Sequence, residues 1–594
     1  MLSLTNQLAL QHFINAYTQE TGKGYLLDQN QQSPQQKKLS QNLPLLVIEI
    51  DSIQAEFYFP LEYVSLVGRH RLAALPSVSI SGQAKKMSPV TIVGLLLEEL
   101  VIASNLPLDA ASLVEKWIQS RDALHQFLLN RELDFDDLIK ANQNFIESEQ
   151  ALILGHSMHP APKSRTGFVH EDWLKFSPEH QGKTQLQYWL VHQDYVAEGN
   201  ANDGLISSEL KSAIKWYLTE QDLNLLNIYA EYKLIPLHPW QARYLQGKSW
   251  FEQLKQKNKI IDLGLKGWDF SATTSVRTLA SFSAPWMVKP SLSVMITNSV
   301  RVNLEKECYR GELTYRLWHS DFGQKILKQC PSLKAVNDPA WVALKVDNTV
   351  INESICIFRD QPFKTHQQVT CIASLCQDHP VKMENRFTQI FASILEQGQH
   401  SDGSALALDW FNRFLEVGLK PLMHLYHRCG MAFESHQQNV LLELENHFPK
   451  TLWLRDNQGF YYIEEYAAEI LKFLPELKEK AFAVGSKAFV DERFSYYFFG
   501  NTLFGIINAI GITGYVTEQQ LLEHLKAFLL GQLKEYPEST LLQGLLYQPT
   551  LPYKGNLLTR LHELDELTAP VENQSIYVQL PNPLCISQED IQYA

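Results

Sequence analysis

The chain of 594 residues has little cysteine and no excess of basic residues. Its seven cysteines, none of them before Cys308, are too few for a disulfide framework and favour a reducing cytoplasm. A formal net charge of −13 opposes binding to phosphate backbones or anionic lipid, so we expect neither nucleic acid nor a membrane as a partner. The first residues lack a basic region ahead of their apolar run, so a signal peptide or an anchor is not expected.

Long uncharged runs are also scarce, with one exception at residues 494–517. This stretch is long enough to span a bilayer, but it contains Asn501, Asn508 and four glycines. A buried, tightly packed helix is the better interpretation. With 45% hydrophobic and 20% charged residues, the whole chain predicts a soluble protein with several buried cores.

Hydrophobic periodicity divides the chain into three parts and predicts an α+β fold. Residues 1–150 mix strands such as 45–50 with amphipathic helices, and we expect this part to support the others. Residues 151–355 are rich in short strand-like runs separated by turn residues. Residues 356–594 are mainly helical, with one hairpin at 439–454.

The common catalytic signatures are missing. There is no Walker A motif, no GxGxxG and no GxSxG, so the usual nucleotide-binding and hydrolase folds are not supported. Three polar clusters stand out instead, and each has a structural as well as a functional interpretation.

The first cluster, residues 155–168, combines His156, His159, Lys163 and Arg165 without any acidic residue. Lysine as a point charge and arginine as a planar fork predict a grip for phosphate or carboxylate. The alternative is a loop of solvated charges. The two histidines could also indicate zinc, but no acidic ligand stands nearby, so this interpretation is weak.

The second cluster begins with Ser275 and Arg277, which would share one face of a strand, and Lys289 opens the next strand-like run. Thr297 is predicted as a helix N-cap, with Arg301 one turn further on. A helix N-terminus beside arginine would suit a multiply charged carboxylate. In the alternative, both arginines pair with surface acids.

The third cluster surrounds the predicted hairpin. Asn439 comes directly before one strand and Asp456 directly after the next, so the two should lie at adjacent strand ends. Protein kinases hold magnesium with an asparagine and an aspartate in a similar relation, although the kinase signatures are absent here. Glu434 and His436 precede the asparagine on the same loop. A hairpin capped by polar residues is the structural alternative.

Together the clusters offer cationic grips for anions and an oxygen site for magnesium, which is what a nucleotide meeting a carboxylate requires. The motifs also resemble those of the NRPS-independent siderophore (NIS) synthetases, the aerobactin-synthetase or IucA/IucC type. Order and spacing are similar from about residue 150 to 460, and the downstream segment resembles the family's FhuF-like portion. Ser157 departs from the pattern, where proline is expected at a loop position. The motifs are GHSMHPAPKSRTGF (155–168), HPWQ (238–241), TSVRT (274–278), KPSLSVMITNSVR (289–301), ESHQQN (434–439) and RD (455–456).

The resemblance implies a hand-like fold with a thumb (1–150), fingers (151–355) and a distantly kinase-like palm (356–594), usually in a homodimer. It also implies that ATP and a carboxylate, typically citrate, give an acyl-adenylate and pyrophosphate. An amine or hydroxyl then attacks, giving an amide or ester and AMP. The acid is citrate, a substituted citrate or a 2-oxoglutarate-type acid, and the nucleophile is a polyamine, an N-hydroxylated amine, an amino acid or an alcohol.

By the same resemblance, the phosphates or the adenylate are contacted by Ser275, Arg277 and Lys289. The carboxylate substrate is held by Thr297 and Arg301, while His436 contacts the reacting carboxylate or accepts a proton. Arg277, Arg301 and His436 form the catalytic set.

The remaining roles implied by the resemblance concern the nucleotide and the metal. Gln438 and Asn439 line the junction between nucleotide and acid, and magnesium is bound by Asn439, Asp456 and Glu434. Lys163 and Arg165 close over the triphosphate, with His156 and His159 shaping that loop or orienting substrate.

Three rival functions remain open on the sequence. A kinase-like phosphotransferase would release ADP, and a non-catalytic iron-siderophore binding protein is suggested by the FhuF-like tail. A histidine-based zinc hydrolase would require stoichiometric zinc.

Overall fold

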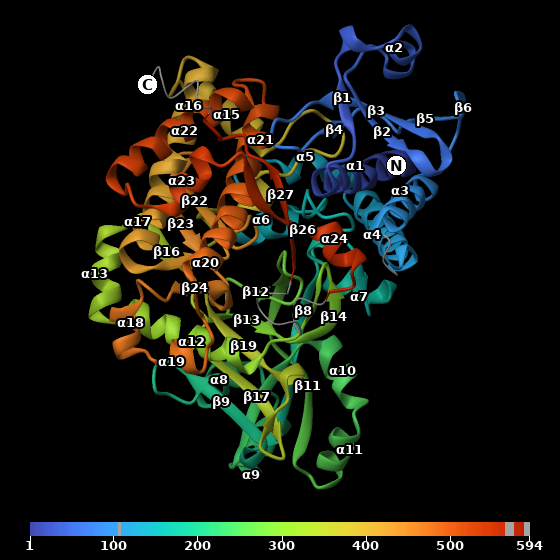
Figure 1. The fold of residues 1–594 in the computed structure, drawn as a ribbon. Helices are drawn as coiled ribbons and strands as arrows, with labels where there is room; N and C mark the ends of the chain where they lie inside the picture. Colours follow the sequence, from blue (N-terminus) through green and yellow to red (C-terminus); the bar gives the residue numbers. More distant parts are fainter. Residues whose placement is uncertain (105–107, 565–574, 587–594) are drawn as a thin grey trace.

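The computed structural model describes residues 1–104, 108–564 and 575–586. Helices and strands alternate along the chain in three packed parts, coloured mainly blue, green and orange in Figure 1. This mixture of helices and largely antiparallel sheets confirms the predicted α+β class.

The N-terminal part packs helices onto one face of an antiparallel sheet. Helix α24 (Asn556–Leu561), from the far end of the chain, joins this core through Leu557 and Leu561 and contacts α1 and α4 (Figure 1). A helix from the C-terminal part is therefore built into the first structural unit. Elements of this part are α1 (Leu2–Thr21), β1 (Tyr25–Leu27), α2 (Pro34–Ser40), β2 (Leu45–Ile50), β3 (Ala55–Tyr63), β4 (Arg71–Leu72), β5 (Ser77–Ile80), β6 (Gln83–Lys85), α3 (Pro89–Ser104), α4 (Ala110–Asn130), α5 (Phe135–Leu138) and α6 (Phe145–Ala151).

The middle part is built on a nine-stranded antiparallel sheet of order β10-β8-β11-β12-β13-β19-β17-β18, with β9 paired to β17. A smaller sheet, β15-β14-β7, lies beside it. The strands are β7 (Arg165–Thr166), β8 (Lys183–His192), β9 (Val196–Asn200), β10 (Tyr232–Leu237), β11 (Ile260–Ala272), β12 (Leu279–Ala280), β13 (Trp286–Pro290), β14 (Leu292–Ile296), β15 (Ser299–Arg301), β17 (Ala340–Val346), β18 (Thr349–Val350) and β19 (Cys356–Asp360). The helices are α7 (His170–Phe176), α8 (Ile206–Ile214), α9 (Glu220–Ile228), α10 (Pro239–Gln246) and α11 (Ser249–Gln256). Two further helices, α12 (Glu305–His319) and α13 (Asp321–Gln329), lead from the middle part into the C-terminal core, which Leu317 and Ile326 join.

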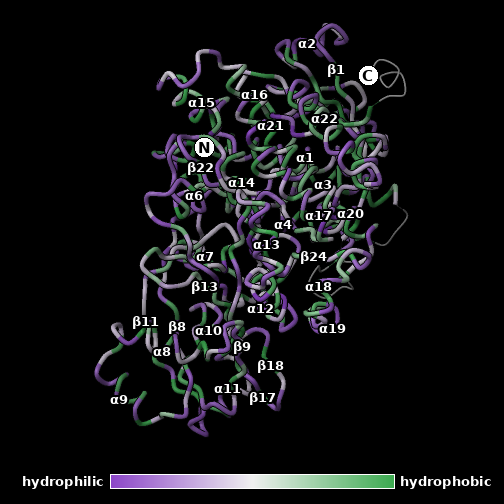
Figure 2. Tube along the Cα trace, turned by 90° about the vertical axis from the view of Figure 1, so that its left-hand side faces the viewer, coloured by the Kyte–Doolittle hydropathy of each residue, from purple (hydrophilic) through white to green (hydrophobic). Residues whose placement is uncertain are grey.

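The C-terminal part contains the largest hydrophobic core, and Figure 2 shows hydrophobic residues gathered among its packed helices. Two small sheets, β16-β23-β22-β20 and β21-β24-β25, are enclosed by these helices. The strands are β16 (Leu333–Ala335), β20 (Gln368–Cys371), β21 (Met431–Phe433), β22 (Val440–Glu445), β23 (Phe448–Leu454), β24 (Phe460–Ile463), β25 (Val484–Gly485), β26 (Thr550–Gly555) and β27 (Ile576–Pro581). The helices are α14 (Ile372–Leu375), α15 (Arg386–Glu396), α16 (Gly403–Phe414), α17 (Lys420–Cys429), α18 (Ala468–Phe473), α19 (Glu476–Glu479), α20 (Lys487–Phe494), α21 (Phe504–Ile512), α22 (Glu518–Glu535) and α23 (Thr540–Tyr547).

The uncharged stretch near residue 500 forms a buried helix, as predicted. A π-helical segment, η10 (Ser495–Leu503), runs directly into α21, and every residue of both is buried. Among the described residues, no helix combines the length and the apolar character needed to cross a bilayer. π-helical turns often occur at functional sites, and η10 contributes to the pocket described below.

Candidate active site

One pocket lies between the middle and the C-terminal parts of the molecule, and all three polar clusters contribute to its wall. Every residue that the sequence singled out as a site residue lines it. These residues are His156, His159, Lys163, Arg165, Ser275, Arg277, Lys289, Thr297, Arg301, Glu434, His436, Gln438, Asn439 and Asp456. The structure therefore brings the predicted site residues together in one pocket, although two of the local structures predicted for them are wrong.

The segment that carries Ser275 and Arg277 is a turn, and the predicted strand is wrong. Strand β11 ends at Ala272, and Val276 has a left-handed backbone with φ of 67°. The Ser275 hydroxyl accepts a hydrogen bond from the Thr278 N–H at 3.0 Å, so local side-chain bonds replace the strand ladder. Serine and threonine at this density are a turn signal that the strand pattern concealed.

Arg277 extends from this turn into the interior. Its guanidinium donates to the Arg301 carbonyl at 3.0 Å and to the Asn303 side chain at 2.8 Å. Burial lowers the pKa of Arg277 to about 10, so the side chain keeps its charge at neutral pH. No carboxylate is within ion-pair distance of Arg277 among the described residues, and the surface-pairing alternative is wrong for it.

The segment at Thr297 is a hairpin turn, and the predicted helix N-terminus is wrong. Thr297 has φ of 54° and joins β14 to β15, which ends at Arg301. The Arg301 guanidinium donates to the Thr297 hydroxyl at 2.6 Å and to the Ile296 carbonyl at 3.0 Å. The two side chains meet as expected, but across a hairpin, so no helix dipole acts here. A Thr-Asn pair between apolar runs is the hairpin signal that could have shown this.

The hairpin at the third cluster is confirmed. Val440 of β22 pairs with Leu454 of β23, which brings Asn439 and Asp456 to adjacent strand ends. The Arg455 N–H donates to the Asn439 carbonyl at 3.1 Å. Asp456 has φ of 71°, a strained backbone for a residue with a side chain, and this conformation turns the chain at the pocket.

Asp456 is held by two cations. Lys289 donates to its carboxylate, and a guanidinium nitrogen of Arg359 lies 3.1 Å from the same oxygen. Burial alone would raise the pKa of Asp456, but the charges of Lys289 and Arg359 hold it well below its usual range. Arg359 comes from β19 and also pairs with buried Asp338 at 2.6 Å. No local sequence pattern marks Arg359, so sequence reasoning missed it.

Lys163 and Arg165 share a buried carboxylate that the sequence did not reveal. The Glu179 Oε1 atom lies 2.7 Å from the Lys163 Nζ atom and 2.5 Å from an Arg165 guanidinium nitrogen. Burial would raise the pKa of Glu179, but Arg165 and then Lys163 lower it to about 2. The 155–168 loop contains no acidic residue, and its counter-ion, Glu179, comes from the short helix Pro178–His180.

His156 and His159 order the loop through their rings. Their Nδ1 atoms accept main-chain N–H groups of Met158 at 3.1 Å and Ala161 at 3.0 Å. The His159 Nε2 atom lies 3.0 Å from the Asn298 side-chain oxygen. Within the described ranges, no group of three His, Cys, Asp or Glu side chains could hold a metal ion. These contacts fit a loop-shaping role and give the zinc interpretation no support.

His436 is positioned as a neutral ring. Burial, followed by the positive charge of Lys554, lowers the pKa of His436 to about 3. Its Nδ1 atom accepts the Gln438 N–H at 3.2 Å, which places the ring proton on Nε2. Nε2 is 3.9 Å from the Glu434 carboxylate. In this tautomer the ring can donate a hydrogen bond to an acid in the pocket.

Several wall residues come from segments without any recognised motif. Lys554 and Asn556 arrive from β26 and the start of α24, and Tyr496, Tyr497 and Asn501 from η10. The Asn556 side chain donates to the Met158 carbonyl at 3.1 Å and so ties the C-terminal segment to the first cluster. Long separation along the chain explains why no sequence pattern indicated them.

The HPWQ motif supports the site from outside the pocket. Gln241 exchanges two hydrogen bonds with Ser293 of β14, at 2.9 and 2.7 Å. His238 caps α10 by accepting the Trp240 N–H at 3.1 Å. The motif therefore anchors the strand that leads to the Thr297 turn.

Comparison with known proteins agrees with this arrangement. The family model described as "IucA / IucC family" matches residues 144–377, and that of the "Ferric iron reductase FhuF-like transporter" matches residues 408–569. The rhizobactin siderophore biosynthesis protein RhbC of Rhizobium meliloti is 32% identical, with 90% of this chain and 92% of that protein aligned. The spermidine-citrate ligase of Bacillus anthracis is 30% identical over 98% of both chains. The solved structure of ATP-bound aerobactin synthetase IucA from Klebsiella pneumoniae superposes with a TM-score of 0.88 at 26% identity, covering 98% of this chain and all of that one.

The fold, the charged pocket and these likenesses define an enzyme of the ligase class that acts in siderophore biosynthesis. The chain belongs to the IucA/IucC family of siderophore synthetases. The resemblance noted on the motifs is thereby confirmed over nearly the whole length of the chain.

Proposed function

We propose that this synthetase activates a carboxylate of citrate, or of a citrate derivative, with ATP and joins the acyl group to an amine or hydroxyl nucleophile. A carboxylate oxygen attacks the α-phosphorus and pyrophosphate leaves. The nucleophile then attacks the acyl carbon, loses its proton and displaces AMP. Relatives named as citrate ligases and the ATP-bound IucA structure support this reaction.

The observation that carries the proposal is the charge of the pocket in an acidic protein. Arg277, Lys289 and Arg301 all line one cavity, although the chain has a net charge of −13. Transfer of AMP to a carboxylate brings several negative charges together, and fixed cations in a buried site stabilise that arrangement. We assign Ser275, Arg277 and Lys289 to the phosphates or the adenylate.

The acid has its own grip in this proposal. Thr297 and Arg301, joined by their 2.6 Å hydrogen bond, present a hydroxyl and a guanidinium for the carboxylate substrate. His436 donates its Nε2 proton to the reacting carboxylate, a role that its tautomer favours over proton acceptance. We assign Gln438 to the junction between nucleotide and acid, and its side chain donates to the Thr274 hydroxyl at 3.3 Å.

Magnesium fits the donor set at the hairpin. Asn439, Asp456 and Glu434 supply oxygen atoms, which this ion prefers, and it needs few protein ligands because it keeps several waters. When bound, it would neutralise phosphate charge. Lys289 and Arg359 both contact the Oδ1 atom of Asp456, so a turn of Lys289 towards phosphate would free this oxygen for the metal and would couple the two roles.

Lys163, Arg165, His156 and His159 complete the proposal. Two cations on the single Glu179 carboxylate leave a net positive charge beside the pocket, which favours the triphosphate. The two histidines hold the loop in shape. We also retain the hand-like division into residues 1–150, 151–355 and 356–594, the distantly kinase-like palm and the homodimer as proposals that rest on the family resemblance.

Carboxylate-dependent exchange of labelled pyrophosphate into ATP tests the reaction, with hydroxylamine trapping of the activated acid as a second measurement. We expect exchange with citrate or a citrate derivative and a hydroxamate product. ADP formation without exchange would instead indicate a kinase-like phosphotransferase. Tight iron-siderophore binding without turnover would indicate the non-catalytic alternative.

A further inference from the structure

A buried glutamate behind the pocket joins the two halves of the proposed active site. Glu149, on α6, is 0% exposed and does not line the pocket itself. Its Oε2 atom accepts hydrogen bonds from the Thr274 N–H at 2.9 Å and the Thr274 hydroxyl at 2.8 Å. Its Oε1 atom lies 2.9 Å from an Arg455 guanidinium nitrogen. One carboxylate thus holds a turn of the middle part and the end of a C-terminal hairpin.

Arg455 links Glu149 to the residues proposed to bind magnesium. Its guanidinium donates twice to the Gln438 carbonyl, at 2.9 and 2.6 Å, and its N–H donates to the Asn439 carbonyl. Asp456 is the next residue in the chain. On the other side, Thr274 begins the turn that presents Ser275 and Arg277 to the pocket. Glu149 therefore fixes where the phosphate-contacting turn stands relative to the Asn439–Asp456 hairpin.

Helix α6 is a firm base for this carboxylate. Asn144 and Glu147 form a capping box at its start. The Ser148 hydroxyl accepts the Cys371 N–H at 3.1 Å, and the Ser374 hydroxyl donates to the Ser148 carbonyl at 2.6 Å. Ser148 thus ties the helix to the C-terminal part next to Glu149, which restricts the movement of that side chain.

We propose that Glu149 is a positioning residue for the activation step. This inference rests on the proposed function, because it assigns Glu149 to the alignment of the two groups of residues that would hold ATP, magnesium and the acid. Displacement of reacting groups by about 1 Å can cost about 100-fold in rate. The Glu149 carboxylate prevents such a displacement because its two oxygens accept from both Thr274 and Arg455. The amide of a glutamine has one acceptor oxygen and could accept from only some of these donors.

The test compares Glu149→Gln with Glu147→Gln, a control on the same helix that retains its capping box because glutamine also serves at that position. Pyrophosphate exchange is measured over a range of ATP concentrations, and folding is followed by thermal unfolding. We expect kcat per folded molecule to fall about 100-fold in Glu149→Gln, with KM for ATP changed less than about threefold. Glu147→Gln should match the wild type.

A purely structural role would lower the unfolding temperature and the folded fraction while leaving kcat per folded molecule within about threefold of the control, and that result would overturn the proposal. If Glu149→Gln does not fold because Arg455 loses its counter-ion, Glu149→Asp decides. It keeps the charge but shortens the reach to Thr274, and we expect a folded enzyme at least about tenfold slower. Normal turnover by this variant would also overturn the proposal. Absence of exchange in the wild type with every carboxylate would contradict the proposed function instead.

Discussion

Two carboxylates at the pocket each hold two cations, yet their surroundings differ. Glu179 binds Lys163 and Arg165, and its side chain is only 1% exposed. Asp456 binds Lys289 and Arg359, and its side chain is 21% exposed at a strained turn of the pocket wall. Lys163, Arg165 and Lys289 appear alike in the sequence, as basic residues in motifs, whereas Arg359 lies outside every motif.

The difference separates a fixed charge cluster from an exchangeable one. A fully buried pair cannot lose one partner without leaving an uncompensated charge in the interior, so the Glu179 set is part of the folded framework. Asp456 faces the pocket, where a metal ion could replace its cations and a phosphate could draw them away from it. Both clusters line the pocket, and the exposure of the carboxylate, not the residue type, distinguishes them.

The largest expected effect comes from breaking the exchangeable cluster. In Asp456→Asn the side chain keeps its size but loses the charge that Lys289 and Arg359 share, and the proposed magnesium ligand is weakened. We expect pyrophosphate exchange to fall by about 1,000-fold, the upper range for loss of one preorganised electrostatic group. Exchange assays with a magnesium titration measure this. Activity near that of the wild type would remove Asp456 from the proposed site.

Breaking the buried cluster should affect stability first. Glu179→Gln leaves Lys163 and Arg165 without their counter-ion, and we expect a loss of about 3 to 5 kcal/mol in the free energy of unfolding. Denaturant titration measures it. An unchanged midpoint would show that the two clusters do not differ as described.

The same cluster predicts a pH dependence. Because the pKa of Glu179 is lowered to about 2 in the folded protein, against an ordinary value of 4.5, its contribution is complete above pH 4.5 and is lost as the pH falls towards 2. Protonation of Glu179 should lower the free energy of unfolding of the wild type by about 3 kcal/mol between pH 4.5 and 2. Glu179→Gln has no such carboxylate and should not show this loss. Unfolding curves at several pH values, compared between the two proteins, provide the measurement.

His436 sharpens the comparison from the catalytic side. Its pKa of about 3 keeps the ring neutral, so it should not produce an acid limb in the exchange rate between pH 5 and 8. We expect His436→Gln to lower exchange about 100-fold at every pH in that range. The free energy of unfolding of His436→Gln should also fall less on acidification than that of the wild type. In the wild type, the unfolded ring takes up a proton below about pH 6.5, whereas the folded ring stays neutral, and this difference destabilises the folded state. A wild-type acid limb that disappears in His436→Gln would contradict the neutral ring.

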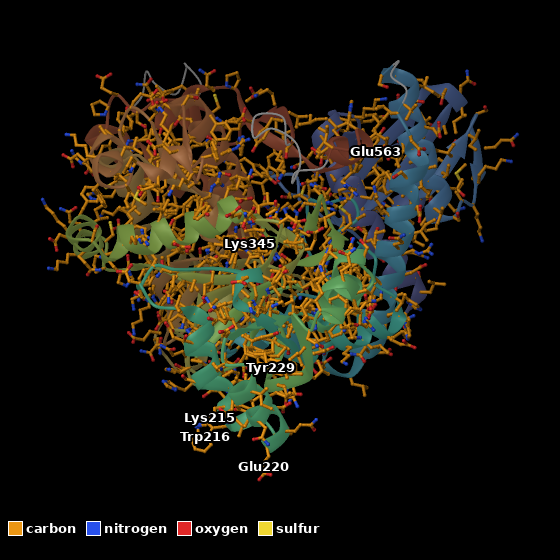
Figure 3. The ribbon with its side chains drawn as sticks, turned by 90° about the horizontal axis from the view of Figure 1, so that it is seen from below. Lys215, Trp216, Glu220, Tyr229, Lys345 and Glu563 are labelled. Carbon is orange, nitrogen blue, oxygen red and sulfur yellow. The ribbon has the colours of Figure 1, made fainter. Side chains whose placement is uncertain are left out.

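The smallest effect is expected far from both clusters. Lys215 and Trp216 project at the far end of the middle part (Figure 3), and Trp216 is 92% exposed. Lys215→Met removes a lysine charge, as a change at Lys289 would. Lys289, however, pairs with Asp456 in the pocket, whereas Lys215 lies on the surface away from it. We expect its stability to change by less than about 0.5 kcal/mol and its exchange activity to stay at the wild-type level. A clear loss of exchange would mean that total charge, and not position, governs activity.

Local patterns predicted much of the fold. The strand expected at residues 45–50 is β2 to the residue, and the buried helix near residue 500 is present as η10 and α21. The hairpin with Asn439 and Asp456 at its ends was also correct. These elements succeed because alternation, helical periodicity and turn residues act over a few neighbouring positions.

The failures occurred where side chains compete locally with regular structure. Thr274 and Ser275 bind nearby main chain or Glu149, so the expected strand becomes a turn. Thr297 adopts a left-handed backbone in a hairpin, so the expected helix start is absent. In both cases the residues were placed correctly in the pocket although their backbone was not.

The sequence by itself determined the class of protein, the α+β composition and part of the membership of the pocket, because motifs of fixed spacing contain the residue types that the chemistry needs. Only the tertiary structure decided which charges neutralise one another. Glu149, Glu179, Arg359 and Lys554 stand in unremarkable local sequence and acquire their importance from partners far along the chain. The strength of such pairs depends on distance and burial, which exist only after the three parts have packed together.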